Sequence, residues 1–163
     1  KLKQKGIKLN ISKWQRPPQN SSPWDSKAAG LYMICTLSKH EAEKQGYTDS
    51  LMLDHEGNIA EATSANIFFK DTNDELNTPI PDSFLDGITR RSIIEIAKQK
   101  GIKVIERKIK IDEMADFVGC FLTGTAAEVT PVSCIAENKF KVCEMIIDLN
   151  KSYQILVKKK KAA

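Results

Sequence analysis

The amino-acid sequence predicts a mixed α/β fold, and three observations lead to this prediction. The chain has 163 residues, of which 41% are hydrophobic and 28% are charged, values typical of a globular protein with one hydrophobic core. Short apolar segments of strand length occur between longer segments whose apolar residues recur at helical spacing. The sequence contains neither an internal repeat nor a low-complexity domain. We therefore expect a single domain over residues 1–163.

The N-terminal part of the chain predicts a strand, a loop and a helix. Residues 6–11 alternate between apolar and polar, as in a strand, and residues 15–24 contain three prolines, as in a loop. Residues 28–45 follow the helical period and are followed by Gly46, a natural helix end. Four residues of this helix are predicted to face inward: Tyr32, Ile34, Cys35 and Leu37.

Three short strands are predicted next in the chain. They cover residues 50–53, 59–61 and 66–70, with a turn at residues 55–58 between the first two. Strands separated by short polar turns are typical of a β-meander.

The second half of the chain alternates between helices and strands. A helix over residues 89–100 directs Ile93, Ile94 and Ala97 to its apolar side, and Asp112 opens a second, short helix. The remaining predicted elements are strands at 104–109, 118–122 and 131–135, and a final helix at 141–157.

Composition and charge exclude several classes of protein. The net charge is +4, and part of it lies in residues 158–161, a lysine run that we interpret as a solvated tail. Nucleic-acid binding would require a basic stripe with interleaved aromatic residues, and the sequence has none. It also has no apolar stretch of about 18 residues and no signal-like segment. We therefore expect no nucleic-acid partner, no membrane span and a cytoplasmic location.

Cysteines and histidines do not form a recognisable site in the sequence. The four cysteines are far apart and include no C-x-x-C pair, so neither a disulfide framework nor a zinc knuckle is indicated. The two histidines, His40 and His55, are predicted to lie on the surface. A Ser-His-Asp triad or a histidine-based metal site is therefore not expected.

Three other segments favour ligand binding. Residues 85–91 form a glycine turn that leads directly into a helix, where free N–H groups and the Thr89 hydroxyl suit an anion. Residues 123–128 are small and rich in hydroxyl groups, so the backbone can approach a ligand closely. Residues 61–66 place the carboxylate of Glu61 among small residues. In isolation, the three segments also fit an unliganded helix start, a tight turn and a solvent-facing strand end.

Together these segments resemble the class IV aminotransferases, which use pyridoxal 5'-phosphate (PLP) and include branched-chain and D-amino-acid aminotransferases and aminodeoxychorismate lyase. Residues 61–69 resemble the family signature, residues 87–90 and 124–131 its two phosphate-side loops, and residues 26–32 its lysine segment. The four segments occur in the family's order and extend over nearly the whole chain. The resemblance implies the large domain of the fold-type IV PLP enzymes, a pseudo-barrel of strands with outer helices.

The resemblance also implies a catalytic role for Lys27, which would form the imine with PLP and then move protons between the substrate Cα and the cofactor. Glu61 would face the pyridine nitrogen and keep it protonated. Tyr32 would donate a hydrogen bond to the phenolic oxygen of the cofactor. Without the matching context, Lys27 would be one of 25 basic residues, and Tyr32 a half-buried core tyrosine.

The remaining residues of the implied site surround the phosphate and the substrate. The Gly87 turn, with the N–H groups of Ile88 and Thr89, would hold the phosphate together with Thr125. Leu85 would pack on the ring, Gly124 would shape the substrate side, and Thr125 and Ala126 would contact the substrate. No metal ion is expected.

The implied reaction is amino transfer between a branched-chain L-amino acid (Leu, Ile or Val) and 2-oxoglutarate. Three alternatives remain open: a D-amino-acid aminotransferase or aminodeoxychorismate lyase of the same fold, an inactive PLP-binding or dimerising fragment, and phosphate binding at Gly87 without lysine chemistry. Family members also carry a smaller N-terminal domain. We expect this domain to be absent from the chain, the full-length protein to be a homodimer, and an interface to be exposed.

Overall fold

One curled sheet of nine strands organises the part of the chain that is described. The structure is a computed structural model; it describes residues 5–161, with the backbone alone for residues 159–161. In chain order the strands are β1 (Ile7–Gln15), β2 (Asp49–Leu53), β3 (Ile59–Ala62), β4 (Asn66–Lys70), β5 (Leu76–Thr78), β6 (Val104–Glu106), β7 (Gly119–Gly124), β8 (Glu128–Ile135) and β9 (Asn138–Lys139). The helices are α2 (Tyr32–Lys44), α3 (Ile88–Gln99) and α4 (Glu144–Lys161), with short 3-10 helices η1 (Gln19–Ser21), η2 (Ala29–Leu31) and η3 (Ile111–Asp116).

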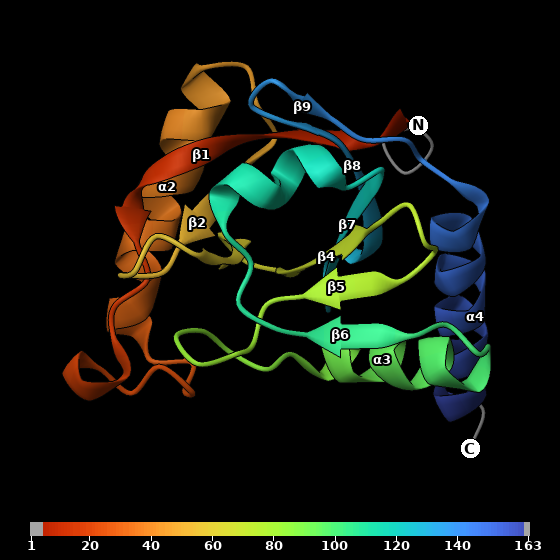
Figure 1. Ribbon diagram of the computed structural model, residues 1–163. Coiled ribbons are helices and arrows are strands. Elements are labelled where there is room, and N and C mark those ends of the chain that lie inside the picture. Colours follow the sequence, from red (N-terminus) through yellow and green to blue (C-terminus); the bar gives the residue numbers. More distant parts are fainter. Residues whose placement is uncertain (1–4, 162–163) are drawn as a thin grey trace.

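The strand order is β3-β2-β1-β8-β7-β4-β5-β6, with β9 paired to β8. The central strand β1 runs parallel to both of its neighbours, whereas β7 is antiparallel to both β4 and β8. The sheet curls until its β3 end approaches the chain after β6, where Ile59 donates a backbone hydrogen bond to Ile109 at 2.8 Å. This curvature, with α2, α3 and α4 outside (Figure 1), confirms the predicted pseudo-barrel with outer helices.

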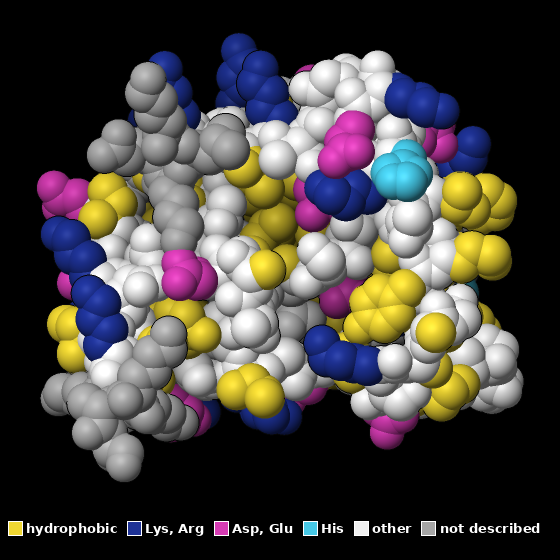
Figure 2. Space-filling view, turned by 180° about the vertical axis from the view of Figure 1, so that it is seen from behind, with side chains coloured by type: hydrophobic (Ala, Val, Ile, Leu, Met, Phe, Trp, Pro, Cys, Tyr) yellow, Lys and Arg dark blue, Asp and Glu magenta, His cyan; other side chains and the backbone are white. Residues whose placement is uncertain are grey.

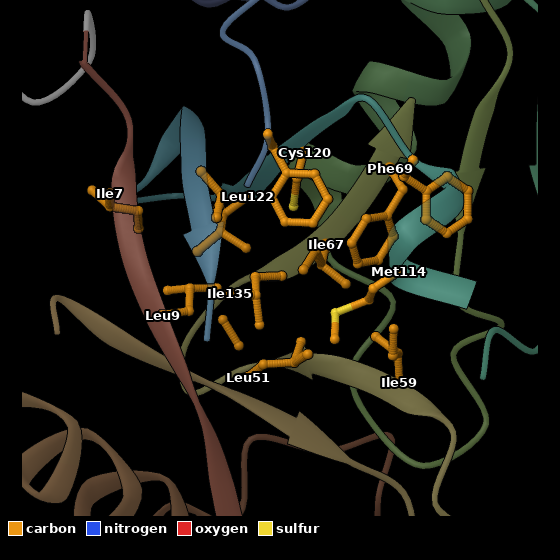
Figure 3. Close-up of a cluster of buried hydrophobic side chains, with 14 of the residues drawn as sticks. Ile7, Leu9, Leu51, Ile59, Ile67, Phe69, Met114, Cys120, Leu122 and Ile135 are labelled. Carbon is orange, nitrogen blue, oxygen red and sulfur yellow. The ribbon is translucent and has the colours of Figure 1, made fainter. Parts of the chain in front are cut away.

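The inside of the curled sheet is filled by the larger of two hydrophobic clusters. Strand residues such as Leu9, Leu51 and Ile67 point toward one another, and Met114 of η3 closes the cluster from one side (Figure 3). The second cluster lies between the sheet and two of the helices, where Phe68 and Phe121 stack with ring centroids 5.0 Å apart. The sheet is therefore buried on both faces, which explains why all five residues of β4 are buried and why its three central residues, Ile67, Phe68 and Phe69, are all apolar rather than alternating.

The predicted β-meander is wrong in its third strand. β2 and β3 form the expected antiparallel pair, but β4 pairs with β5 and β7 instead of β3. Sequence proximity favours a meander, but the buried apolar residues of β4 match those of β7 across the sheet, which sequence spacing does not reveal. Two short strands, β5 with three residues and β9 with two, were not predicted from the sequence.

The inward face of α2 also differs from the prediction. Its buried residues are Cys35, Ser38 and Ala42, whereas Leu37 is 45% exposed and Tyr32 is 37% exposed. Ser38 is compatible with burial because its hydroxyl group bonds Ser12 Oγ at 2.7 Å and the carbonyl group of Ile34, also at 2.7 Å. The prediction assumed that apolar residues mark the inner face, but here a hydrogen-bonded serine occupies it.

The other elements differ from the predictions mainly in the residues at which they begin and end. α3 begins at Ile88 with Gly87 as its N-cap, and the short helix near Asp112 is the 3-10 helix η3, which begins at Ile111 with Lys110 as its N-cap. The predicted strand over 104–109 ends at Glu106. α4 extends to Lys161, so the lysine run continues the helix instead of forming a separate tail. The φ angles of Gly46 and Gly101, 83° and 72°, are typical of helix ends.

The surface shows no single dominant type of side chain. On the face opposite to that of Figure 1, lysine and arginine side chains lie in several separate groups between acidic and hydrophobic ones (Figure 2). Within residues 5–161, every helix is too short or too polar to cross a lipid bilayer. His40 and His55 are exposed, as predicted.

Candidate active site

A cavity of about 400 Å³ opens where the start of α2, the start of α3, the end of β7 and the turn after β3 meet. Cavities of this size are typical of sites for small molecules and cofactors. Nine of the ten residues predicted for the site line it: Lys27, Tyr32, Glu61, Leu85, Gly87, Ile88, Thr89, Gly124 and Thr125. The tenth, Ala126, is exposed beside the cavity and does not line it. Tertiary structure thus brings together segments that are widely separated in the chain.

The carboxyl group of Glu61 is the acidic group buried in this cavity. Glu61 is only 9% exposed, and loss of hydration raises its pKa from 4.5 to about 8. Nearby Asp49 raises the pKa further, whereas the positive charges of Arg16 and Lys27 lower it without cancelling the effect of burial. The interpretation of Glu61 as a solvent-facing strand end is therefore wrong. In the ligand-free protein this carboxyl group carries a proton at neutral pH.

Arg16 is the cation nearest to Glu61, with its Nε 3.6 Å from Glu61 Oε1. Its guanidinium group is buried and held in place by several acceptors: Nε donates to the carbonyl of Ser83 at 3.2 Å, and Nη1 donates to the carbonyl of Leu31 and to Cys35 Sγ, both at 3.4 Å. Because these contacts come from three different segments, Arg16 joins the strand β1 to the walls of the cavity. Arginine retains its charge even when buried, so the cavity keeps a fixed positive group.

A second buried carboxylate, Asp49, lies behind Glu61. It accepts hydrogen bonds from the Thr63 hydroxyl group at 2.5 Å and from the backbone N–H of Ser50 at 2.8 Å. A nearby negative charge favours the neutral form of Glu61, which agrees with the direction of its pKa.

Lys27 approaches the same cavity from the loop between η1 and η2. Its side chain is exposed, lines the cavity and lowers the pKa of Glu61 by its charge. Tyr32, at the start of α2, lines the same wall. An amine and a buried carboxyl group therefore face one cavity, an arrangement that suits a ligand with both an electrophilic group and a basic ring nitrogen.

The opposite end of the cavity is formed by the N-terminus of α3. The N–H groups of the first helical turn, at Ile88 and Thr89, have no carbonyl partner inside the helix, and the helix dipole makes this end positive. The Thr89 hydroxyl group lies 3.2 Å from the Tyr153 hydroxyl group of α4, which ties the turn to the C-terminal helix. Thr125 faces this region from beyond β7. This end of the cavity therefore suits an anion.

Several cavity residues were missed by the sequence analysis. Arg16, Cys35, Asn66 and Thr123 all line the cavity. Asn66 and Thr123 lie inside the segments 61–69 and 123–128, whereas Arg16 and Cys35 belong to no segment with a distinctive pattern. A search of segment 61–69 for polar residues beyond Glu61 would have found Asn66. For Arg16, a single arginine before two prolines, the sequence carries no comparable signal.

Comparison with known proteins identifies relatives of the chain. A model of the class IV aminotransferases matches residues 1–135. The chain is 50% identical over 133 residues to a probable branched-chain-amino-acid aminotransferase of Rickettsia conorii, a match that covers 81% of this chain and 45% of the relative. It is 36% identical over 132 residues to the branched-chain-amino-acid aminotransferase of Escherichia coli K12, covering 81% and 43% of the two chains.

A solved structure shows the same fold. The branched-chain amino acid aminotransferase of Thermobaculum terrenum, in its PLP form, superposes with a TM-score of 0.88 at 31% identity, over 93% of this chain and 51% of that one. The present chain therefore spans about half the length of the relatives it matches.

Proposed function

The chain belongs to the class IV aminotransferase family, and we propose from this that it forms the PLP-binding part of an enzyme that transfers an amino group between a branched-chain L-amino acid and 2-oxoglutarate. The observation that carries the proposal is the cavity that brings Lys27, the buried carboxyl group of Glu61 and the N-terminus of α3 together. The relatives named as branched-chain enzymes, at up to 50% identity, support the substrate class.

The residues of the cavity fit PLP chemically. The cofactor carries an aldehyde, a ring nitrogen and a phosphate dianion, and the cavity offers an amine, a protonated carboxyl group and a helix N-terminus. The solved relative from Thermobaculum terrenum is in its PLP form, which supports the same cofactor for this chain. When bound, PLP supplies an electron sink that lowers the barrier to proton loss from the substrate Cα.

Glu61 holds and shares a proton in this scheme. Burial raises the pKa of its carboxyl group to about 8, so this group would share a proton with the ring nitrogen of a bound cofactor. Arg16, whose Nε lies 3.6 Å from Glu61 Oε1, would stabilise the Glu61 carboxylate when the nitrogen holds that proton. Burial raises the energy of any isolated charge here, so the paired state is favoured over either charge alone.

Lys27 supplies the amine that attaches the cofactor and moves the proton at the substrate Cα. Its side chain is exposed and lines the cavity, so the amine would be accessible to a ligand bound there. Tyr32 and Leu85 line the same cavity; Tyr32 would orient the ring oxygen of the cofactor, and Leu85 would pack against its ring.

The anion end of the cavity binds the phosphate in this scheme. Ile88 and Thr89 donate their backbone N–H groups, with the Gly87 turn and the Thr125 hydroxyl group beside them. Gly124, Thr125 and Ala126 then border the space left for the substrate, although Ala126 lies outside the present lining. We also propose that the full-length protein is a homodimer, because several large apolar side chains are exposed, among them Met33, Leu37 and Ile88.

The first experiment tests attachment of PLP. The protein is mixed with PLP, reduced with borohydride and digested, and the modified peptide is identified by mass spectrometry. We expect modification at Lys27, together with an absorbance band near the visible edge that is lost on reduction. Lys27→Ala should lose both signals, whereas the matched control Lys44→Ala, an exposed lysine of α2, should keep them. Modification spread over surface lysines would contradict the proposal.

The second experiment tests the substrate class. L-leucine added to the PLP-loaded protein should convert the absorbance band, and D-alanine should not. Conversion by D-alanine alone, or release of pyruvate from aminodeoxychorismate, would replace the branched-chain assignment by one of the sibling activities. A PLP-loaded chain that reacts with no amino acid would identify a binding or dimerising part that needs the rest of the longer protein.

A further inference from the structure

Asn66 makes two hydrogen bonds to the turn that precedes α3. Its Nδ2 donates to the carbonyl of Leu85 at 2.8 Å, and its Oδ1 accepts from the backbone N–H of Gly87 at 3.1 Å. Asn66 is the first residue of β4 and is 5% exposed. The side chain of Asn66 in the sheet therefore binds Leu85 and Gly87, two residues of a turn that lies much later in the chain.

The middle residue of the turn is held from the helix side. Asp86 Oδ1 accepts from Arg90 Nη1 at 2.8 Å, and Asp86 Oδ2 lies 3.4 Å from Arg91 Nη1. Leu85 and Gly87 are thus fixed by the sheet and Asp86 by the helix. The turn has little freedom left, and the direction of the first N–H groups of α3 follows from its geometry.

The contact between Gly87 and Asn66 leaves no room for a larger residue. A Cβ atom at position 87 would overlap Asn66 Oδ1, although Gly87 has a φ of −63° that any residue adopts. Glycine is therefore required here by the close approach of Asn66 and not by backbone conformation. Gly87 N–H is already bonded to Asn66, whereas the N–H groups of Ile88, Thr89 and Arg90 have no partner within the helix. Of these three residues, Ile88 and Thr89 line the cavity.

An asparagine suits this place because a carboxamide donates and accepts at once without carrying charge. Aspartate would accept from Gly87 but could not donate to Leu85, and its charge would repel an anion at the helix start. A leucine of similar size would leave both backbone groups without a partner, which is costly in a buried turn. Asparagine at position 66 therefore suits a turn beside an anion site, because it satisfies both backbone groups without adding a negative charge.

We propose that Asn66 is a positioning residue for the anion site, which fixes the turn at residues 85–87 so that the N–H groups of Ile88 and Thr89 point into the cavity. This inference rests on the proposed function, because it concerns the phosphate end of the PLP site. Asn66 acts through the backbone of the turn and does not itself contact the ring or the substrate in this scheme.

The test compares PLP with pyridoxal, which has the same aldehyde and ring but no phosphate. Affinities of both ligands are measured by absorbance titration for the wild type, for Asn66→Ala and for Asn66→Ser, whose shorter side chain can keep at most one of the two bonds. We expect both variants to bind PLP about ten-fold more weakly and to bind pyridoxal with nearly the affinity of the wild type. The preference for PLP over pyridoxal should therefore fall.

The matched control is Asn77→Ala. Asn77 is also buried on a strand and also makes two side-chain bonds, to Asp71 at 3.2 Å and to Arg107 at 2.9 Å, but it does not line the cavity. It should leave the preference for PLP unchanged. Hydrogen exchange of the Gly87 amide, whose N–H donates to Asn66 Oδ1, should be faster in Asn66→Ala than in the wild type and gives a second readout that does not depend on ligand binding.

Two outcomes overturn the inference while leaving the proposed function intact. Either both ligands weaken equally in the Asn66 variants, which indicates a general structural defect, or PLP affinity does not change at all. If the wild type itself binds no PLP, the proposed function is wrong and the inference falls with it.

Discussion

Substitution Glu61→Gln should change how the stability of the ligand-free protein depends on pH. Burial raises the pKa of Glu61 from 4.5 to about 8, so the folded state holds a proton more tightly than the unfolded state does. Between those two pH values the folded protein binds more protons, and its free energy of unfolding falls as pH rises. The contribution is fully present below pH 4.5 and is lost as pH approaches 8.

The size of the effect follows from this pKa. Each pH unit inside the interval corresponds to about 1.4 kcal/mol, and between about pH 5 and pH 8 the wild type should lose roughly 3–4 kcal/mol through Glu61. Glutamine at this position does not titrate, so Glu61→Gln should lack this slope. The substitution also alters the contact with Arg16, 3.6 Å away, which shifts the free energy of unfolding of the variant. The quantity to compare is therefore the slope of the free energy of unfolding against pH, and not its value at one pH.

Urea denaturation of the ligand-free wild type and variant at about pH 5, 6, 7 and 8 provides the measurement, with Glu95→Gln as the control. Glu95 lies on the surface of α3, where its side chain is 65% exposed, and this variant should follow the wild-type profile. Parallel profiles for the wild type and Glu61→Gln would refute the reasoning, because the carboxyl group would then titrate alike in the folded and unfolded states.

Three further predictions follow from the packing of the site and the core. Gly87→Ala should lower the free energy of unfolding by about 2 kcal/mol and weaken PLP binding, because the added Cβ displaces Asn66; urea denaturation and absorbance titration measure the two effects, and an unchanged PLP affinity would contradict the prediction. Phe68→Ala should cost about 3–5 kcal/mol in urea denaturation, because it removes the ring stacked on Phe121; a loss below about 1 kcal/mol would show that the cluster is loosely packed. Burial raises the pKa of the Cys35 thiol, so iodoacetamide should label it at about pH 8 several-fold more slowly than a free thiol, and bound PLP should slow it further; mass spectrometry reads the rate, and labelling as fast as for a free thiol would count against a buried Cys35.

Much of the fold is a local property of the sequence. The helical spacing around Ile93 and Ala97 predicts α3, and the turn chemistry at Gly46 and Gly101 predicts the ends of α2 and α3, because these signals depend on residues within a few positions of each other. The longer strand segments were found for the same reason, whereas β5 and β9, with three and two residues, are too short to show a period.

The residues of the candidate site likewise differ in whether the local sequence indicates them. Lys27, Glu61 and the turns at Gly87 and Gly124 lie in contiguous segments whose residue types can be recognised one segment at a time. Arg16 and Cys35 carry no such signal. Their place in the cavity depends on contacts with Ser83 and Glu61, which are distant in sequence.

The sequence alone therefore indicated most of the longer elements, the family resemblance and nine of the residues that line the cavity. Tertiary structure decided which strand pairs with β4, which residue of α2 is buried, and that Glu61 is protonated. Strand pairing and desolvation depend on groups from distant segments that meet only when the sheet curls, and the energy of a charge depends on all the atoms that replace its water. The sequence specifies which residue stands at each position, whereas the pKa of that residue depends on its environment in the folded protein.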